Sequence, residues 1–271
     1  MSELRPYPDT LAFIEAALPY WQAHPVLCNL QWALSKQYAA TGQLEKAFIL
    51  YQDGQIHAIG IQTDPPRPLI LQCQGKLTGA QVRQVEQFLG KPIGLIATTT
   101  LAKDYLAGSR YAPIGELGLV IYELGQLSPD YALAGGVLKL ATLQDLDWLT
   151  PWMQAFLEFI EEIGGENDYR NRAIQLIEKK QLYVYFLAGQ PVSMAASTRS
   201  CGGVAAINYV FTPPELRGKG YSPACVGALC ETLLQAHTHC VLFADADYPS
   251  SNAVYRKLGF HQVGTSVEIT F

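Results

Sequence analysis

The residues best suited to chemistry lie in a short basic segment, 217–222, that reads Arg-Gly-Lys-Gly-Tyr-Ser. Gly218 and Gly220 would let backbone N–H groups approach a ligand closely, and Arg217 and Lys219 add two positive charges beside them. Backbone amides with nearby cations are a combination that binds phosphate or pyrophosphate. The glycines alone favour an ordinary surface turn with solvated cations, so the flanking residues must decide.

The flanking residues predict that this segment joins a strand to a helix. Residues 207–212 are rich in β-branched and aromatic side chains, and Pro213-Pro214 end the strand. We expect Ser222 to be the N-cap and Pro223 the first helical residue, followed by apolar residues at helical spacing: Ala224, Val226, Leu229, Leu233 and Leu234. A helix N-terminus offers unpaired N–H groups and partial positive charge, which favours the anion-binding interpretation.

A second segment of interest, 251–260, reads Ser-Asn-Ala-Val-Tyr-Arg-Lys-Leu-Gly-Phe and is separated from the first by a predicted helix and strand. Together the two segments resemble the GNAT superfamily of acyl-CoA-dependent N-acetyltransferases. Its pyrophosphate loop follows the pattern Arg/Gln-x-x-Gly-x-Gly/Ala, which Arg217, Gly220 and Ser222 meet, with serine where glycine or alanine is usual. Residues 251–260 are similar to the family's Ser-Asn-x-x-Tyr-x-Lys-x-Gly-Phe segment. The resemblance is specific over 137–271 and only architectural over 1–126.

The resemblance implies acetyl-CoA as the acyl donor and assigns residues to it. The strand before the loop would supply backbone groups to the pantetheine arm and thioester from Val210, Phe211 and Thr212. The loop would hold the pyrophosphate through Arg217, Gly218, Lys219, Gly220, Tyr221 and Ser222. Asn252 would form a hydrogen bond with the pantetheine.

The resemblance also implies a proton donor, Tyr255, for the departing thiolate. A phenol with a pKa near 10 can give that proton without being charged at neutral pH. The alternative is a tyrosine that only packs near Leu258.

The general base is harder to identify, because some family members place a glutamate on the strand that here covers 205–211, and this strand contains none. Asn208, with Tyr209, could order a water that relays the proton of the amine. Asp245 is a second candidate, although its position before a helix is more typical of a cap or turn residue.

An acidic run suggests a small cationic amine as the acceptor. In the family the first two helices of the domain border the acceptor, and here they carry Glu158, Glu161, Glu162, Glu166 and Asp168. Glu162 and Glu166 are our candidate substrate-binding residues; with Glu158 they would share one face if the helix continued past Gly164-Gly165. A solvated acidic face of an amphipathic helix is the alternative.

Composition limits the other possibilities. The chain has 271 residues, 49% of them hydrophobic, and a net charge of −5, which argues against a nucleic-acid or anionic-membrane partner. Six scattered cysteines without metal-ligand spacing predict neither a zinc site nor a disulfide framework, so we expect reduced thiols, no metal and a cytoplasmic location. We expect no signal peptide, because the N-terminal residues lack a basic region followed by an apolar core, and no membrane span, because no apolar run reaches membrane-spanning length. It leaves the oligomeric state open.

The sequence predicts a mixed α/β fold with two related halves: a degenerate GNAT-like domain over 1–127, a linker over 128–136 and a GNAT domain over 137–271. Residues 48–63 and 183–198 align without a gap as glycine-turn hairpins that match Gly54 with Gly189 and Thr63 with Thr198. After the first hairpin, 74–78 reads Gln-Gly-Lys-Leu-Thr, which offers no comparable cradle for pyrophosphate.

Two functions fit these features. The first is an N-acetyltransferase that moves an acetyl group from acetyl-CoA to a primary amine. The alternative is a non-catalytic module that binds acyl-CoA and controls a partner contact, which the missing strand glutamate favours. Asn252 and Tyr255 favour the enzyme. A nucleotide-hydrolysing phosphate loop is excluded because Lys219 is not followed by Ser or Thr.

Overall fold

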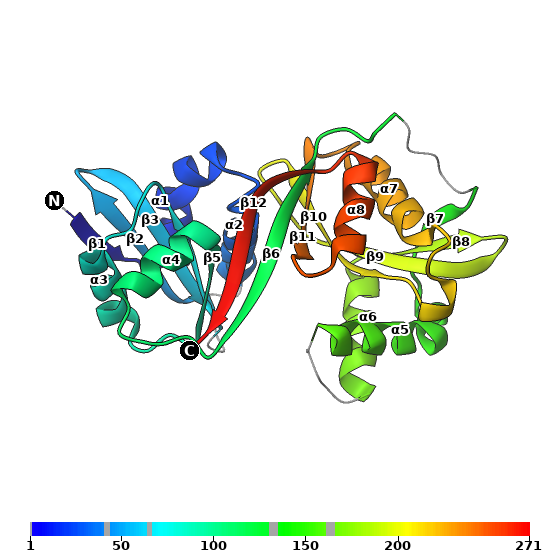
Figure 1. Cartoon of the computed structure of the whole chain (residues 1–271), viewed down its shortest axis with the longest axis horizontal. Coiled ribbons are helices and arrows are strands. Elements are labelled where there is room, and N and C mark those ends of the chain that lie inside the picture. The colour runs from blue at the N-terminus through cyan, green and yellow to red at the C-terminus, as the bar shows by residue number, and fades with distance from the viewer. Residues whose placement is uncertain (1, 41–43, 64–66, 130–134, 161–165) are drawn as a thin grey trace. The chain divides into compact units, whose positions relative to one another are not determined.

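The computed structural model describes residues 2–40, 44–63, 67–129, 135–160 and 166–271 (Figure 1). The chain is a mixed α/β protein in which one order of elements occurs twice. The first pass contains β1 (Ser2–Pro6), α1 (Thr10–Ala23), α2 (Asn29–Ala39), β2 (Leu44–Gln52), β3 (Gln55–Thr63), β4 (Leu69–Cys73), α3 (Gly79–Leu89), β5 (Gly94–Thr98), α4 (Thr99–Gly108) and β6 (Gly115–Leu124). The second contains β7 (Val137–Leu140), α5 (Leu146–Phe159), α6 (Glu166–Glu178), β8 (Leu182–Leu187), β9 (Gln190–Cys201), β10 (Val204–Phe211), α7 (Tyr221–Leu233), β11 (His239–Asp245), α8 (Pro249–Leu258) and β12 (His261–Thr270). This repetition confirms the predicted mixed α/β fold with two related halves.

The two hairpins that suggested the repeat have the same turn. Asp53 and Gly54 join β2 to β3 with φ values of 50° and 79°, and Ala188 and Gly189 join β8 to β9 with 48° and 79°. Positive φ at both central residues is typical of the tight hairpin turns whose twist matches that of the flanking strands. The hairpin turns of the two halves therefore have the same backbone conformation, with glycine at the second turn position.

The chain divides into two compact units whose borders differ from the predicted domain borders. One unit holds Met1–Ile121, Phe243–Pro249 and Gln262–Phe271, and the other holds Tyr122–Leu242 and Ser250–His261. Strand β12 explains part of the difference, because it pairs antiparallel with β5, from Ser266 opposite Thr98 to Thr270 opposite Gly94. The last strand of the second half of the sequence thus completes the first unit. The division into 1–127, 128–136 and 137–271 stays a proposal about the repeat.

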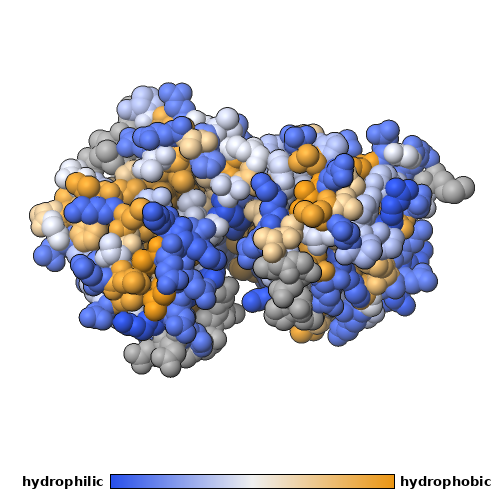
Figure 2. Space-filling model, turned by 180° about the vertical axis from the view of Figure 1, so that it is seen from behind, coloured by the Kyte–Doolittle hydropathy of each residue, from blue (hydrophilic) through white to orange (hydrophobic). Residues whose placement is uncertain are grey.

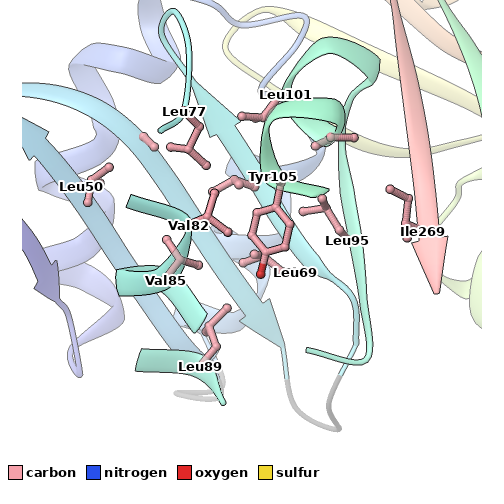
Figure 3. Close-up of a cluster of buried hydrophobic side chains, with 14 of the residues drawn as sticks. Leu50, Leu69, Leu77, Val82, Val85, Leu89, Leu95, Leu101, Tyr105 and Ile269 are labelled. Atoms are coloured by element: carbon pink, nitrogen blue, oxygen red, sulfur yellow. The ribbon is translucent and has the colours of Figure 1, made fainter. Parts of the chain in front are cut away.

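In the first unit, β1 to β5 follow one another in the sheet and β12 comes next to β5. Strands β4 and β5 run parallel, with Leu69 opposite Leu95, and the pairs before them are antiparallel. Helices α3 and α4 cover one face, where Val82, Val85 and Tyr105 point into a core of strand residues (Figure 3). Strand β1 was not predicted, because its sequence lacks β-branched residues; it forms by pairing with β2.

In the second unit the sheet order is β11-β10-β9-β8-β7, with β10 and β11 parallel and the other pairs antiparallel. Helices α5 and α6 pack on one face, and α7 and α8 lie on the other (Figure 1). The α5–α6 face has its own core, in which Leu149, Met153 and Ala173 pack against Val184, Met194 and Phe211.

Apolar side chains are interspersed with polar ones over the face of the molecule shown in Figure 2. Within the residues that the structure describes, no helix is both long enough and apolar enough to cross a membrane. All six cysteines lie in described segments, and each is a free thiol.

Candidate active site

The loop between β10 and α7 places Gly220, rather than Ser222, at the helix N-cap. Gly220 has φ 80° and ψ 11°, and α7 begins at Tyr221, so Ser222 is the second helical residue and Pro223 the third. The predicted cap was therefore wrong by two residues. The left-handed conformation that ends the loop is one that glycine adopts readily, so the helix can begin directly after it. Proline at the third helical position is tolerated because the first-turn N–H groups have no partner inside the helix.

The loop backbone is open to a ligand. Gly218 also has a positive φ, of 76°, and a Cβ atom built on either glycine would meet nothing within 4 Å. The N–H groups of Gly220, Tyr221 and Ser222 have no hydrogen-bond acceptor among the described residues. Unpaired amides at the positive end of a helix favour a bound anion. The residues present therefore fit a phosphate or pyrophosphate group.

The two cations of the loop are held by backbone carbonyls. Arg217 donates from Nε to the carbonyl oxygen of Thr212 at 3.0 Å, and its Cζ lies 5.9 Å from the centre of the Phe211 ring. Lys219 donates from Nζ to the carbonyl oxygen of Glu215 at 3.3 Å. Arg217 thus ties the loop back to the end of β10 while its charge stays beside the cradle.

Strand β10 is irregular where the pantetheine is predicted to bind. Its ladder with β11 covers Val204–Ile207, and its register with β9 shifts between Asn208 and Phe211. The carbonyl oxygen of Phe211 accepts a hydrogen bond from Ser193 Oγ at 3.0 Å, and Thr212 Oγ1 lies 2.9 Å from the same hydroxyl. Val210 lies inside the irregular stretch. The predicted pantetheine contacts of Val210, Phe211 and Thr212 stay predictions, on a strand end that protein contacts hold in place.

Asn208, the candidate for ordering a water, lies at the start of this irregularity. Its Nδ2 donates to Thr198 Oγ1 at 2.6 Å, while its Oδ1 is buried and has no hydrogen-bond partner among the described residues. A buried acceptor without a donor costs free energy, on the order of 1–3 kcal/mol, unless a ligand or water supplies one. The carbonyl of this amide is therefore a ready acceptor for an N–H or O–H group.

Helix α8 carries Asn252, which is buried, and Tyr255, which is half-buried. The Tyr255 ring lies 6.1 Å from that of Tyr122 and 6.0 Å from that of Phe260. Burial raises the pKa of Tyr255 to about 12, so its hydroxyl is protonated at neutral pH. Among the described residues, no hydrogen bond or ring contact joins Tyr255 to Asn208. The ring contacts allow the packing alternative, and the proton-donor role stays a prediction.

Asp245 has the geometry of a turn residue. Its Oδ1 accepts a hydrogen bond from the backbone N–H of Asp247 at 2.8 Å, and its carbonyl oxygen accepts one from Tyr248 at 3.3 Å. Side chains that bond the backbone two residues onward are typical of turns. The structure therefore favours the turn interpretation over the role of general base.

The side chains of the two candidate acceptor residues, Glu162 and Glu166, lie outside the described residues. Helix α5 ends at Phe159 and a separate helix, α6, begins at Glu166, so the condition for a shared face, that the helix of Glu158 continues, is not met at Phe159. The substrate-binding roles of Glu162 and Glu166 stay predictions. The described residues also show no group of three or more His, Cys, Asp or Glu that could hold a metal ion.

Two arginines near Tyr209 were not among the predicted site residues. Arg172 of α6 donates from Nε to the Tyr209 hydroxyl at 2.7 Å. Arg199 of β9 lies close enough to Tyr209 for the phenol to influence its pKa. A charged residue within the small and apolar run of β9 was the available signal for Arg199, whereas the sequence around Arg172 reads as an ordinary exposed helix.

A known protein family matches most of the second half of the chain. Residues 142–260 match the model of the Acetyltransferase (GNAT) family. No curated protein matches the chain.

Three solved structures resemble nearly the whole chain. An acetyltransferase from the GNAT family of Colwellia psychrerythraea has 13% identity, covers 99% of both chains and gives a TM-score of 0.63. The X-ray structure of a Drosophila protein has 9% identity, covers 99% of this chain and 98% of its own, and gives 0.67. A tandem GNAT protein from the clavulanic acid biosynthesis pathway has 10% identity, covers 100% and 98%, and gives 0.55.

At these identities the solved structures show a shared fold, which confirms the tandem GNAT-like architecture. The second half of the chain therefore contains a domain, residues 142–260, that matches the Acetyltransferase (GNAT) family.

Proposed function

We propose that this chain transfers an acetyl group from acetyl-CoA to a primary amine, using the second half of its sequence. The observation that carries the proposal is the loop before α7, where Gly218 and Gly220 leave open space and the N–H groups of Gly220, Tyr221 and Ser222 have no acceptor among the described residues. This arrangement suits the pyrophosphate of a coenzyme A thioester. Asn252 on α8 is proposed to bind the pantetheine arm.

In the proposed reaction, the amine nitrogen forms a bond to the thioester carbonyl carbon and the carbon–sulfur bond breaks. The amine must be neutral when it attacks, and Asn208 is proposed to order the water that accepts its proton. Tyr255 is proposed to give the proton that the leaving sulfur takes up. The raised pKa of Tyr255 keeps its hydroxyl in the protonated form that this role requires.

The acceptor is proposed to be a small molecule whose amine arrives as an ammonium cation. The net charge of −5 and the acidic residues near the end of α5 support an attractive field for such a group. Charge reversal of Glu162 and Glu166 should raise the KM for the amine and leave acetyl-CoA affinity unchanged. The effect should weaken with salt, because exposed charges are screened over about 8 Å at physiological ionic strength. Unchanged KM values would mean that these acidic residues form only a solvated face and do not attract the amine.

A cytoplasmic location is part of the proposal, supported by six free thiols, which reducing compartments maintain. The proposed function is tested by supplying the purified full chain with acetyl-CoA and a panel of primary amines and detecting free coenzyme A thiol. Acetyl-CoA binding is measured in parallel by calorimetry. Thiol release that depends on an amine supports the proposal, whereas a folded chain that does not bind acetyl-CoA refutes it.

A further inference from the structure

Tyr209 holds a strained backbone conformation beside the candidate site. It has φ 52° and lies where the register between β10 and β9 shifts, between Asn208 and Phe211. Such a conformation is uncommon for a bulky residue and occurs preferentially at functional sites. The irregularity re-aims the side chains of the strand, and the ring of Tyr209 lies 5.1 Å from that of Phe156 on α5.

Arg172 brings one positive charge to this tyrosine. Its Nε donates to the Tyr209 hydroxyl at 2.7 Å, and its Cζ lies 5.4 Å from the ring centre. The side chain is exposed, and its Nη groups form no hydrogen bond or ion pair with any described residue. The tyrosine therefore orients a guanidinium whose remaining N–H groups can bind an external acceptor.

Arg199 brings a second positive charge to the same tyrosine. It lies opposite Ala206 in the β9–β10 pairing, where its side chain is half-buried. Burial lowers the pKa of Arg199 to about 10, and the nearby Tyr209 raises it in part, so the side chain is charged at pH 7. Charges withdrawn from water attract an opposite charge more strongly than solvated ones do.

Asn208 precedes Tyr209 and offers the complementary group. Its amide is fixed by the bond from Nδ2 to Thr198 Oγ1, which leaves the buried Oδ1 to accept an N–H donor. At Asn208 the strand thus presents an acceptor that can hold the water facing the amine, and two guanidinium groups lie around the next residue, Tyr209. Two guanidinium groups would repel an acceptor that carries only positive charge.

We propose that the acceptor is an amine that also carries an oxyanion, a carboxylate or a phosphate, which Arg172 and Arg199 bind while the water ordered by Asn208 accepts from the amine nitrogen. Guanidinium groups match the geometry of both oxyanions through paired N–H donors. This inference rests on the proposed acetyl transfer and narrows its substrate class from small molecules that carry an ammonium group to those that also carry an oxyanion, namely amino acid-like or aminoalkyl phosphate compounds.

The test compares acceptors that differ only in the anion. The full chain with acetyl-CoA is assayed with glycine, β-alanine, 4-aminobutyrate and L-α-amino acids, each beside the amine that lacks its carboxylate, and with aminoalkyl phosphates of matched length. We expect the best acceptor to carry an oxyanion and to exceed its matched amine at least tenfold in kcat/KM; the carboxylate and phosphate series identify which oxyanion is preferred. The inference is overturned if the best acceptor lacks an anion, or if a chain that binds acetyl-CoA acetylates no anionic amine. A chain that does not bind acetyl-CoA refutes the proposed function itself.

Variants of one helix sharpen this test. Arg172→Glu should lower kcat/KM for the anionic acceptor about 10- to 100-fold, mainly through KM, because hydrogen bonds to charged groups contribute about 1.5–3 kcal/mol. Arg172→Lys should retain part of this activity. The matched control is Arg170→Glu, which changes an exposed arginine of the same helix that pairs with Asp147 at 3.7 Å, and it should leave kinetics unchanged. Equal losses with the anionic acceptor and its matched amine would mean a structural role for Arg172 and overturn the inference.

Discussion

The helices that follow the middle strands of the two halves, α3 and α7, begin in opposite ways. Thr78 caps α3: its Oγ1 accepts a hydrogen bond from Gln81 N at 3.4 Å, and Gln81 Oε1 accepts one from Thr78 N at 2.9 Å. A carboxylate lies beside them, since Asp104 Oδ2 accepts from Leu77 N at 3.2 Å. In α7 the N-cap is Gly220, no side chain caps the helix, and its first amides stay available.

This difference shows how one fold can keep or lose an anion site. In the first half the chain's own side chains satisfy the helix N-terminus, and a negative charge nearby disfavours phosphate. In the second half glycine supplies the backbone conformation without a competing side chain. The contrast supports the proposal that the first half is degenerate with respect to acyl-CoA.

A second contrast involves the tyrosines of α4 and α8, which are corresponding helices of the two halves. Tyr105 of α4 is fully buried in the core, and its hydroxyl has no hydrogen-bond partner among the described residues. Tyr255 of α8 is only half-buried. Both lie in surroundings that raise the pKa of the phenol, yet of the two only Tyr255 is partly exposed.

The largest effect is expected from Gly220→Val. A side chain at Gly220 would occupy the open cradle and disturb the helix N-terminus. We expect acetyl-CoA affinity to fall by more than about 100-fold, because the pyrophosphate would lose two charge-assisted hydrogen bonds. Calorimetric titration with acetyl-CoA measures this loss of affinity. Gly75→Val is the matched control, because Gly75 has φ 82°, open space at its Cβ, and a place in the loop before α3. Both variants strain the backbone, but only Gly220→Val should lose the coenzyme; equal affinities would refute the loop assignment.

Tyr255→Phe should lower kcat by about 10- to 1000-fold and leave acetyl-CoA affinity nearly unchanged, because the proton is needed only as the thiolate leaves. Steady-state kinetics with an acceptor from the amine panel measures the effect. Tyr105→Phe removes the corresponding hydroxyl in the first half and should leave kcat unchanged. An unchanged kcat in Tyr255→Phe would leave Tyr255 with a packing role only.

The smallest effect is expected on stability. Tyr105→Phe removes a buried hydroxyl that has no partner among the described residues, so the free energy of unfolding should rise by about 1 kcal/mol. Denaturant unfolding at neutral pH measures this change. A clear loss of stability in this variant would mean that the Tyr105 hydroxyl has a partner in solution.

The sequence predicted the parts of this molecule that depend on local chemistry. Hairpins around Gly54 and Gly189 follow from turn preferences, and the strand, loop and helix around Gly220 follow from residue order, although the cap itself was misplaced by two residues. Pairing of β12 with β5 could not be predicted, because either half offers a suitable neighbour and the choice is made by tertiary packing.

The acceptor side was predicted least well. The positive φ of Tyr209 arises from a register shift between strands, which a single strand's sequence does not specify. The proximity of Arg172 and Arg199 to Tyr209 depends on how α6 and β9 pack, so an acidic run was more visible in the sequence than this basic cluster.

The most direct test of the contrast between the halves is the number of acetyl-CoA molecules that the intact chain binds. Calorimetric titration of the full-length protein should give one site per chain, because the helix N-terminus of α7 presents amides and glycines without a capping side chain, whereas the corresponding N-terminus of α3 is capped. Two equivalent sites would contradict the account, because the capped N-terminus of α3 would then have to hold a pyrophosphate as well.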